Sequence, residues 1–164
     1  MGKSIQTIYM AGPLFTAAER VHNIRLAGAL RAYGYNIILP QKDTNQFFPD
    51  GRFDLHGTCA YDLICATNYD LVLANIDGPD ADSGTCVEVG AAMASHIKVL
   101  CVRTDIRTDT KSEVGVNGML QLADRIIYKP ALFTDLTTLK IFYEELVEDI
   151  VKYIRELEAI EDAK

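Results

Sequence analysis

The chain has 164 residues, 49% of them hydrophobic and 24% charged, which is enough to bury the core of one globular domain without disulfides or bound metal. Its formal net charge of −7 argues against sequence-independent binding to nucleic acid phosphates, which requires a basic surface, and leaves small-molecule partners open. No run of residues has the apolar character of a signal peptide or a membrane span. We therefore expect a cytoplasmic protein that binds neither membranes nor nucleic acid.

Strand and helix signals alternate along the chain. Short apolar runs beside turn residues predict strands at residues 5–11, 36–39, 70–75, 97–102 and 125–128. Helical spacing predicts helices at residues 16–33, 54–68, from 84 through the small residues 91–94, at 117–122, and from 135 onward. A polar loop at 41–51, which contains Phe47 and Phe48, and a charged loop at 103–116 complete the order.

Apolar stripes on two helices indicate which faces are buried. The first helix is expected to bury Val21, Ile24, Leu26, Ala27 and Leu30. The last helix is expected to bury Leu139, Phe142, Leu146, Ile150 and Ile154. Five strands joined by helices predict an α/β fold, with a parallel sheet covered by helices on both faces. We expect one domain over residues 1–164, in which 157–164 form a frayed tail.

The four cysteines, Cys59, Cys65, Cys86 and Cys101, show neither C-x-x-C nor zinc-site spacing. They are expected to be buried, reduced thiols, and neither a metal ion nor a cofactor is expected. Cys86 lies two residues before Glu88 and is an alternative nucleophile, but no histidine lies near it in the chain to activate it.

Several candidate site residues follow strands. In an open α/β sheet, ligands bind outside the carboxyl ends of the strands, near the point where the strand order reverses. This rule brings the 9–15 turn, the 75–84 loop and the helix that carries Glu88 around one crevice.

Glu88 is the most informative of these residues, within Asp82-Ser83-Gly84-Thr85-Cys86-Val87-Glu88-Val89-Gly90. It falls in the first two turns of a helix, where the backbone dipole favours a charged, nucleophilic carboxylate. The glycines, Gly84 among them, let a substrate approach the backbone. The alternative is a helix start whose charged residue simply faces water.

The segment after the first strand, Tyr9 to Phe15, is not a phosphate loop. Both G-x-x-x-x-G-K-[ST] and G-x-G-x-x-G are absent, which disfavours a dinucleotide site. Gly12 and Pro13 instead predict a tight turn beneath a ligand, and Phe15 is placed to stack on a planar base. The alternative for Phe15 is packing on the sheet as core.

Asp62 and Asp82 are the other candidate acids. Carboxylates crowded into one pocket cannot all stay ionised, so one is pushed to a higher pKa and can donate a proton. Glu88 facing a protonated aspartic acid is the arrangement that retaining glycosyl transfer needs, with the Tyr9 hydroxyl orienting the glutamate. The alternatives are a charge at a helix start for Asp62 and a solvated loop acid for Asp82.

Together with Asn117-Gly118-Met119-Leu120, these segments resemble the nucleoside 2-deoxyribosyltransferases, from Tyr9 to about Tyr128. The resemblance implies a flavodoxin-like protomer that forms dimers or higher oligomers. It also implies that a glutamate attacks C1′ of a 2′-deoxynucleoside, releases the base, and passes the deoxyribosyl group to another base.

The resemblance assigns a role to each matching residue. It implies Glu88 as nucleophile, Tyr9 as the residue that orients it, and Asp62 and Asp82 as contacts to base and sugar, one of them the proton donor. It further implies substrate contacts for Gly12, Pro13, Leu14, Phe15, Gln41 and Gly84, and for Asn117 and Met119 lent by a neighbouring subunit. The family's terminal aromatic residue has no counterpart in the last residues, 161–164.

Two other functions remain open on sequence grounds. The related 2′-deoxynucleoside 5′-phosphate N-hydrolases use the same glutamate but carry a Ser/Arg-rich phosphate-binding segment after the first strand. Here residues 12–20 are largely hydrophobic and Arg20 is the only cation, which favours free nucleosides and nucleobases as substrates. A flavodoxin-like binding module without chemistry is the third possibility.

Overall fold

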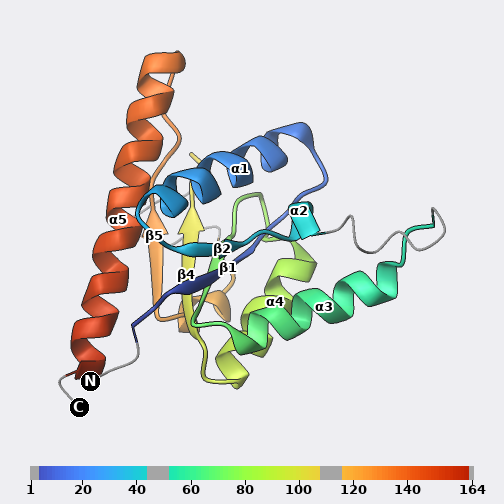
Figure 1. Ribbon diagram of the computed structural model, residues 1–164. Helices are drawn as coiled ribbons and strands as arrows, with labels where there is room; N and C mark the ends of the chain where they lie inside the picture. Colours follow the sequence, from blue (N-terminus) through green and yellow to red (C-terminus); the bar gives the residue numbers. More distant parts are fainter. Residues whose placement is uncertain (1–3, 44–51, 108–115, 163–164) are drawn as a thin grey trace.

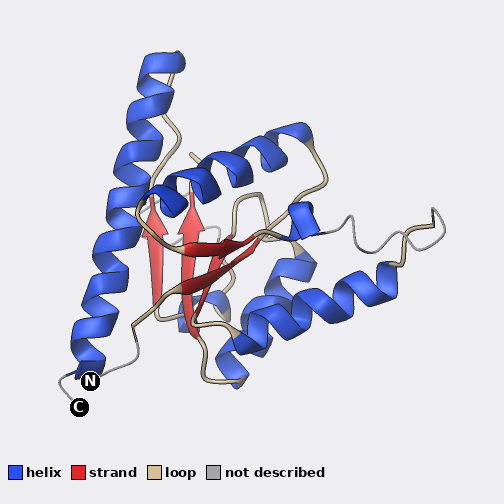
Figure 2. Ribbon diagram, viewed as in Figure 1, coloured by secondary structure: helices blue, strands red, loops and turns tan. Residues whose placement is uncertain are grey.

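The computed structural model describes residues 4–43, 52–107 and 116–162. A parallel sheet lies between two layers of helices in this part of the chain (Figures 1 and 2). The strands are β1 (Thr7–Ala11), β2 (Asn36–Ile38), β3 (Leu71–Asn75), β4 (Lys98–Arg103) and β5 (Arg125–Tyr128). The helices are α1 (Ala17–Ala32), α2 (Pro40–Asp43), α3 (Leu55–Asn68), α4 (Ser83–Ala94) and α5 (Leu136–Asp162), with a 3-10 turn η3 (Leu120–Leu122).

The sheet order is β2-β1-β3-β4-β5, and every pairing is parallel. The order reverses between β1 and β3, so a crevice is expected above their carboxyl ends. Gly12 allows a close approach there, because a Cβ on it would lie 3.1 Å from the Asn75 Cβ. The predicted five-stranded parallel sheet with helices on both faces is therefore confirmed.

Two apolar cores fill the space on either side of the sheet. Helices α1 and α5 cover one face, and α3 and α4 cover the other (Figure 1). Successive side chains of a strand point to opposite faces. Ile8 and Met10 of β1 accordingly lie in the α1/α5 core, whereas Tyr9 and Ala11 lie in the α3/α4 core. This alternation turns Tyr9 toward the helix that carries Glu88.

Side-chain caps mark where three helices begin. Thr16 and Glu19 form a reciprocal capping box at the start of α1. Asp54 caps α3, with its carboxylate accepting from the Gly57 N–H, and Asp82 caps α4 in the same way through Thr85. Each such cap contributes about 1 kcal/mol and fixes the register in which the helix leaves its loop.

The buried face of α1 differs from the prediction. Leu26, Ala27 and Leu30 are buried as expected, but Val21 and Ile24 are 51% and 58% exposed. The inner stripe starts at Asn23, which is 6% exposed, and continues at helical spacing through the buried leucines. The polar Asn23 was overlooked because its side chain interrupts the apolar pattern.

The expected frayed tail at 157–164 needs correction over residues 157–162. Helix α5 continues to Asp162, and Leu157 is 5% exposed. The Glu158 carboxylate accepts from the Ile5 N–H at 2.8 Å and from the Ser4 hydroxyl at 3.1 Å, which ties this end of α5 to the start of the chain.

Smaller differences concern the loops. The expected loop at 41–51 begins with the short helix α2, and Phe47 and Phe48 lie outside the described residues. The expected helix at 117–122 is a 3-10 turn, and only the ends of the 103–116 loop are described. Within the described ranges, no helix combines the length and apolarity that crossing a bilayer requires.

Candidate active site

Tyr9 and Glu88 meet in the α3/α4 core at the carboxyl end of β1. The Tyr9 side chain is fully buried, and its hydroxyl donates a hydrogen bond of 2.7 Å to Glu88 Oε1. Glu88 lies in the second turn of α4, six residues after the Asp82 cap. The structure thus brings together the two residues that the sequence analysis paired.

Burial governs the charge state of this pair. The pKa of Glu88 is raised to about 7, mainly by burial. The Tyr9 hydrogen bond lowers this pKa, and the charges of Asp62 and Asp82 raise it. The expectation that the helix dipole keeps Glu88 readily charged therefore needs correction. The carboxylate loses more stabilisation through its lost hydration than it gains from the helix N-terminus. Burial also raises the pKa of Tyr9, so its hydroxyl remains a donor.

Asp62 lies beside this pair, but not at a helix start. It is half-buried in the third turn of α3, eight residues after the Asp54 cap. Its negative charge raises the pKa of both Tyr9 and Glu88, which puts it within electrostatic reach of both. The alternative of a carboxylate stabilised by the helix N-terminus does not apply to Asp62.

Asp82 has a structural bond as well as a place near Glu88. Its Oδ2 accepts from the Thr85 N–H at 2.9 Å and from the Thr85 hydroxyl at 3.2 Å. A Cβ at Gly84 would lie 3.1 Å from the same oxygen, so glycine lets the carboxylate fold over the first turn. Gly84 also precedes Glu88 by four residues, on the same helix face, and leaves that face open.

The turn at Gly12 and Pro13 is supported by buried polar side chains. Buried Asn23 donates through Nδ2 to the Pro13 carbonyl at 3.0 Å and to Gln41 Oε1 at 3.1 Å. Gln41 is 8% exposed and donates to the Arg20 carbonyl at 3.0 Å. The structure thus gives the Gln41 amide a role in supporting the turn, in place of the expected contact to a base. Asn23 is a functional candidate that the sequence analysis missed.

The outer part of the same segment faces solvent. Phe15 is 76% exposed and Leu14 is half-buried, so Phe15 does not pack as core. The Glu19 carboxylate accepts from the Phe15 N–H at 2.9 Å and from the Thr16 N–H at 2.7 Å. Arg20 donates to the Leu14 carbonyl at 3.2 Å. The amide groups of the two residues just before α1 are thus already bonded to a carboxylate of the protein itself.

Asn117 and Met119 lie at the surface. Both are exposed, Met119 to 68%, and Asn117 Oδ1 accepts from the Met119 N–H at 2.9 Å. That bond shapes their own turn, and neither side chain belongs to the buried Glu88 cluster.

The cysteines, all within the described residues, are free thiols, as expected. Cys65 and Cys101 are buried, whereas Cys86 is half-buried and Cys59 is exposed, which corrects the expectation of burial for these two. Burial and the charges of Asp80 and Asp82 raise the pKa of Cys86. Its thiol is therefore disfavoured as a nucleophile beside Glu88.

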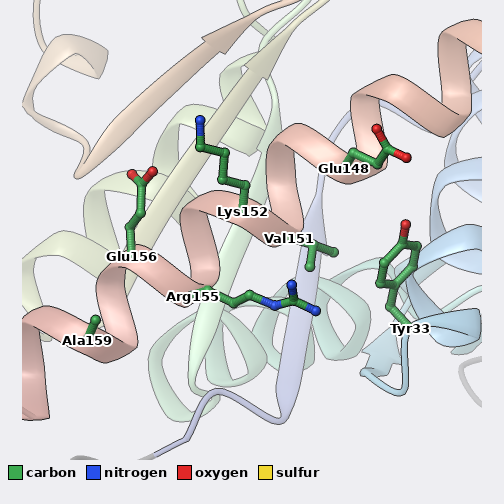
Figure 3. Close-up of a pocket in the computed structure, with 7 residues that line it drawn as sticks. All are labelled: Tyr33, Glu148, Val151, Lys152, Arg155, Glu156 and Ala159. Atoms are coloured by element: carbon green, nitrogen blue, oxygen red, sulfur yellow. The ribbon is translucent and has the colours of Figure 1, made fainter.

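A surface hollow of about 460 Å³ lies away from this cluster (Figure 3). It is lined by Tyr33 and by one side of α5, from which Arg155 extends toward Tyr33. Glu148, Lys152 and Glu156 complete its charged rim. None of the acids around Glu88 lines it, so it provides a remote position for control substitutions.

Comparisons with known proteins agree with this arrangement. A family model described as nucleoside 2-deoxyribosyltransferase matches residues 8–120, which include Tyr9, Asp62, Asp82 and Glu88. No curated protein matches the chain.

Solved structures share the fold. A conserved protein from Enterococcus faecalis V583 has a TM-score of 0.69 at 24% identity, covering 92% of this chain and 99% of its own. The 2-deoxyribosyltransferase from Bacillus psychrosaccharolyticus has 0.63 at 20%, covering 86% and 90%. A CMP N-glycosidase from Clostridium botulinum has 0.55 at 14%, covering 90% and 99%. At these identities the likeness establishes the flavodoxin-like fold alone.

The hydrogen bond between Tyr9 and Glu88 yields a prediction for Tyr9→Phe, which removes only the hydroxyl. Because that bond lowers the pKa of Glu88 while burial raises it, the Glu88 carboxyl of the variant should titrate above the wild-type value of about 7. Carbon-13 NMR of labelled glutamate carboxyls measures the change, with Glu88→Gln identifying the signal. Tyr33→Phe, in the remote hollow, is the matched control and should leave the titration in place. An unchanged or lower Glu88 pKa in Tyr9→Phe contradicts the assigned balance.

Proposed function

Because the chain belongs to the nucleoside 2-deoxyribosyltransferase family, we propose that it exchanges the bases of 2′-deoxynucleosides through an ester between deoxyribose and Glu88. The observation that carries the proposal is the half-buried Glu88 carboxylate, bonded to Tyr9 and accompanied by two further acids. A flavodoxin-like fold alone does not imply this chemistry, since function depends on the site and not on the scaffold.

The reaction consists of two displacements at C1′. The Tyr9 hydrogen bond engages Glu88 Oε1, so we assign the attack to Oε2. As the new C1′–O bond forms, the C1′–N bond breaks, and its electron pair leaves on the base nitrogen. That nitrogen takes a proton, for which Asp62 and Asp82 are the nearby acids. A second base then attacks C1′, gives its N–H proton to the aspartate that protonated the first base, and releases Glu88, so two inversions give net retention.

The sugar preference follows from the transition state and from the walls of the crevice. A hydroxyl at C2′ withdraws electrons and destabilises the oxocarbenium-like transition state, which favours 2′-deoxyribose. The wall residues Gly12, Leu14 and Gly84 carry no polar side chain with which to bond such a hydroxyl. Burying it without a partner adds a further penalty.

Hydrolysis of nucleoside 5′-phosphates is the second candidate, and a glycosidase named for CMP shares the fold. The helix that follows the first strand is a common seat for phosphate, because its first N–H groups point at the ligand. Here the Glu19 carboxylate lies in the first turn of α1 and already accepts hydrogen bonds from the N–H groups of Phe15 and Thr16, which directly precede the helix. It also adds a negative charge that repels a phosphate. This contact favours free nucleosides over nucleotides.

We further propose a homo-oligomer in which Asn117 and Met119 complete the site of a neighbouring subunit. Both side chains are exposed, and Leu122 close by is 68% exposed. Exposed apolar residues grouped on one turn are typical of a surface that contacts a partner. In a two-fold arrangement each subunit gives and receives one such turn.

The first prediction of the proposed function concerns Glu88→Ala. Wild-type protein incubated with deoxyinosine and adenine, and with a wider panel of deoxynucleosides and bases, should form the exchanged nucleoside. Glu88→Ala should lose roughly a thousandfold or more of this activity, because the nucleophile is gone. Glu144→Ala, at an exposed acid of α5, should retain it.

The same assay separates the alternatives. Base release from 5′-monophosphates without an acceptor base indicates the hydrolase, and silence on every substrate indicates a binding module. Substantial exchange by Glu88→Ala places the nucleophile elsewhere and ends this proposal.

The second prediction concerns Glu19→Gln, which keeps the capping oxygen and removes the charge. The ratio of kcat/KM for deoxynucleoside 5′-monophosphates to that for deoxynucleosides should rise about tenfold, the effect of removing one nearby like charge in a partly solvated site. Steady-state kinetics on both substrate series measures it. Glu144→Gln makes the same charge change far from α1 and should leave the ratio in place. An unchanged ratio in both Glu19→Gln and Glu19→Ala contradicts the role of Glu19.

The third prediction tests the composite site. Glu88→Ala and Asn117→Asp subunits should each be inactive alone, and mixing them with exchange of subunits should restore part of the activity. Restoration is expected because a hybrid assembly contains an intact Glu88 beside an intact Asn117. Analytical ultracentrifugation should give at least a dimer. A fully active monomer refutes the proposal.

A further inference from the structure

Two turns at the carboxyl edge of the sheet are tied together by buried polar groups. One turn follows β3 and contains Asp77 and Gly78, and the other starts from Arg103, the last residue of β4, and contains Thr104 and Asp105. We call these five residues the turn lock. Arg103 is 3% exposed and its guanidinium crosses from the second turn to the first. It donates through Nη1 to the Ile76 carbonyl at 2.5 Å and through Nη2 to the Gly78 carbonyl at 2.8 Å.

A carboxylate of the first turn also reaches across to the second. The Asp77 carboxylate accepts from the Thr104 N–H at 2.5 Å, from the Thr104 hydroxyl at 2.6 Å, and from the Asp105 N–H at 2.8 Å. Asp105 Oδ2 in turn accepts from the Gly78 N–H at 3.2 Å. Each turn thus supplies both donors and acceptors to the other, so neither can shift without breaking several bonds at once.

The path of the first turn is fixed by its backbone as well. Gly78 has a φ of +115°, a conformation that residues with a side chain rarely adopt. A Cβ there would lie 2.8 Å from the Asp80 carbonyl oxygen. The chain therefore leaves the lock in one direction and reaches Asp82 four residues later.

The lock is built from groups that are expensive to bury. A buried guanidinium and carboxylates lose their hydration, and such networks often add little to net stability compared with apolar packing. What they do provide is a defined geometry. The chain enters α4 at its cap, Asp82, four residues after this turn, and α4 carries Glu88 to the Tyr9 hydroxyl of β1. A displaced turn therefore shifts α4 and changes the spacing between Glu88 and Tyr9.

We propose that Asp77, Arg103 and Thr104 are positioning residues, which hold the start of α4 so that Glu88 stays within hydrogen-bond distance of Tyr9. The kinetic part of this proposal rests on the proposed base exchange. None of the three needs to touch substrate, and a displacement of about 1 Å can cost as much as a hundredfold in rate.

The test compares Thr104→Val with Thr104→Ser. Valine removes the hydroxyl that bonds Asp77, whereas serine keeps it. Thr104 is chosen because Asp77 also acts electrostatically on His22 and Tyr143, so that replacing Asp77 itself would alter more than the lock. In Thr104→Val, kcat for base exchange should fall about tenfold with KM within twofold, the signature of a misplaced group. Thr104→Ser should keep most of the activity.

A second readout needs no turnover. Because the Tyr9 hydrogen bond lowers the pKa of Glu88, a looser spacing between the two in Thr104→Val should raise that pKa, measured by carbon-13 NMR. Thr104→Ser should leave it in place. Ile150→Val, in the α1/α5 core, is the control for lost stability alone and should lower Tm without moving the Glu88 titration.

The outcomes distinguish this proposal from the proposed function. If wild-type protein shows no base exchange, the proposed function fails and the Glu88 titration still decides on the lock. If Thr104→Val lowers Tm as Ile150→Val does while kcat and the Glu88 titration stay unchanged, the lock is only structural and the proposal is overturned. Should Thr104→Val not fold, Arg103→Lys takes its place, because an ammonium cannot reproduce the fork that reaches two carbonyls.

Discussion

The hydrogen bond from the Tyr9 hydroxyl to the Glu88 carboxylate is the interaction on which the candidate site depends. It joins an inner strand to α4 where little water remains, and a carboxylate there loses much of its hydration. Tyr9 offsets part of that loss without ionising, since its own pKa is raised. A lysine or arginine in its place would neutralise the glutamate. A neutral donor instead orients the carboxylate and leaves its charge available for attack at carbon.

The sequence predicts much of this arrangement because it depends on short-range rules. Alternation along β1 turns Tyr9 toward the α3/α4 face, and a parallel strand order puts Glu88 at the same edge. Helix starts were equally predictable, since Thr16, Asp54 and Asp82 are side chains that cap. The order of strands and helices along the chain follows from such patterns without knowledge of tertiary contacts.

Other properties of the site depend on contacts between distant segments, which no local pattern contains. The pKa of Glu88 is the balance of burial, one hydrogen bond and two neighbouring charges from three elements. Gln41 looked available to a base, but Asn23, 18 residues away, and the Arg20 carbonyl occupy its amide. Arg103 looked like the first residue of a charged loop, and its burial becomes visible only when the β3 and β4 turns lie side by side.

The carboxyl edge of the sheet gathers negative charge in a protein that is already acidic. Asp62 and Asp82 lie within electrostatic reach of Glu88, and Glu19 lies in the first turn of α1. Arg103 is not a counterion free to meet a ligand, because carbonyl oxygens and Asp105 hold its guanidinium in the turn lock. An edge of this kind attracts no anion. Its acids suit a neutral substrate whose transition state develops positive charge on the sugar, which nearby carboxylates stabilise. In the proposed base exchange, the same charges that raise the pKa of Glu88 before reaction therefore favour the oxocarbenium-like state once the Glu88 carboxylate is formed.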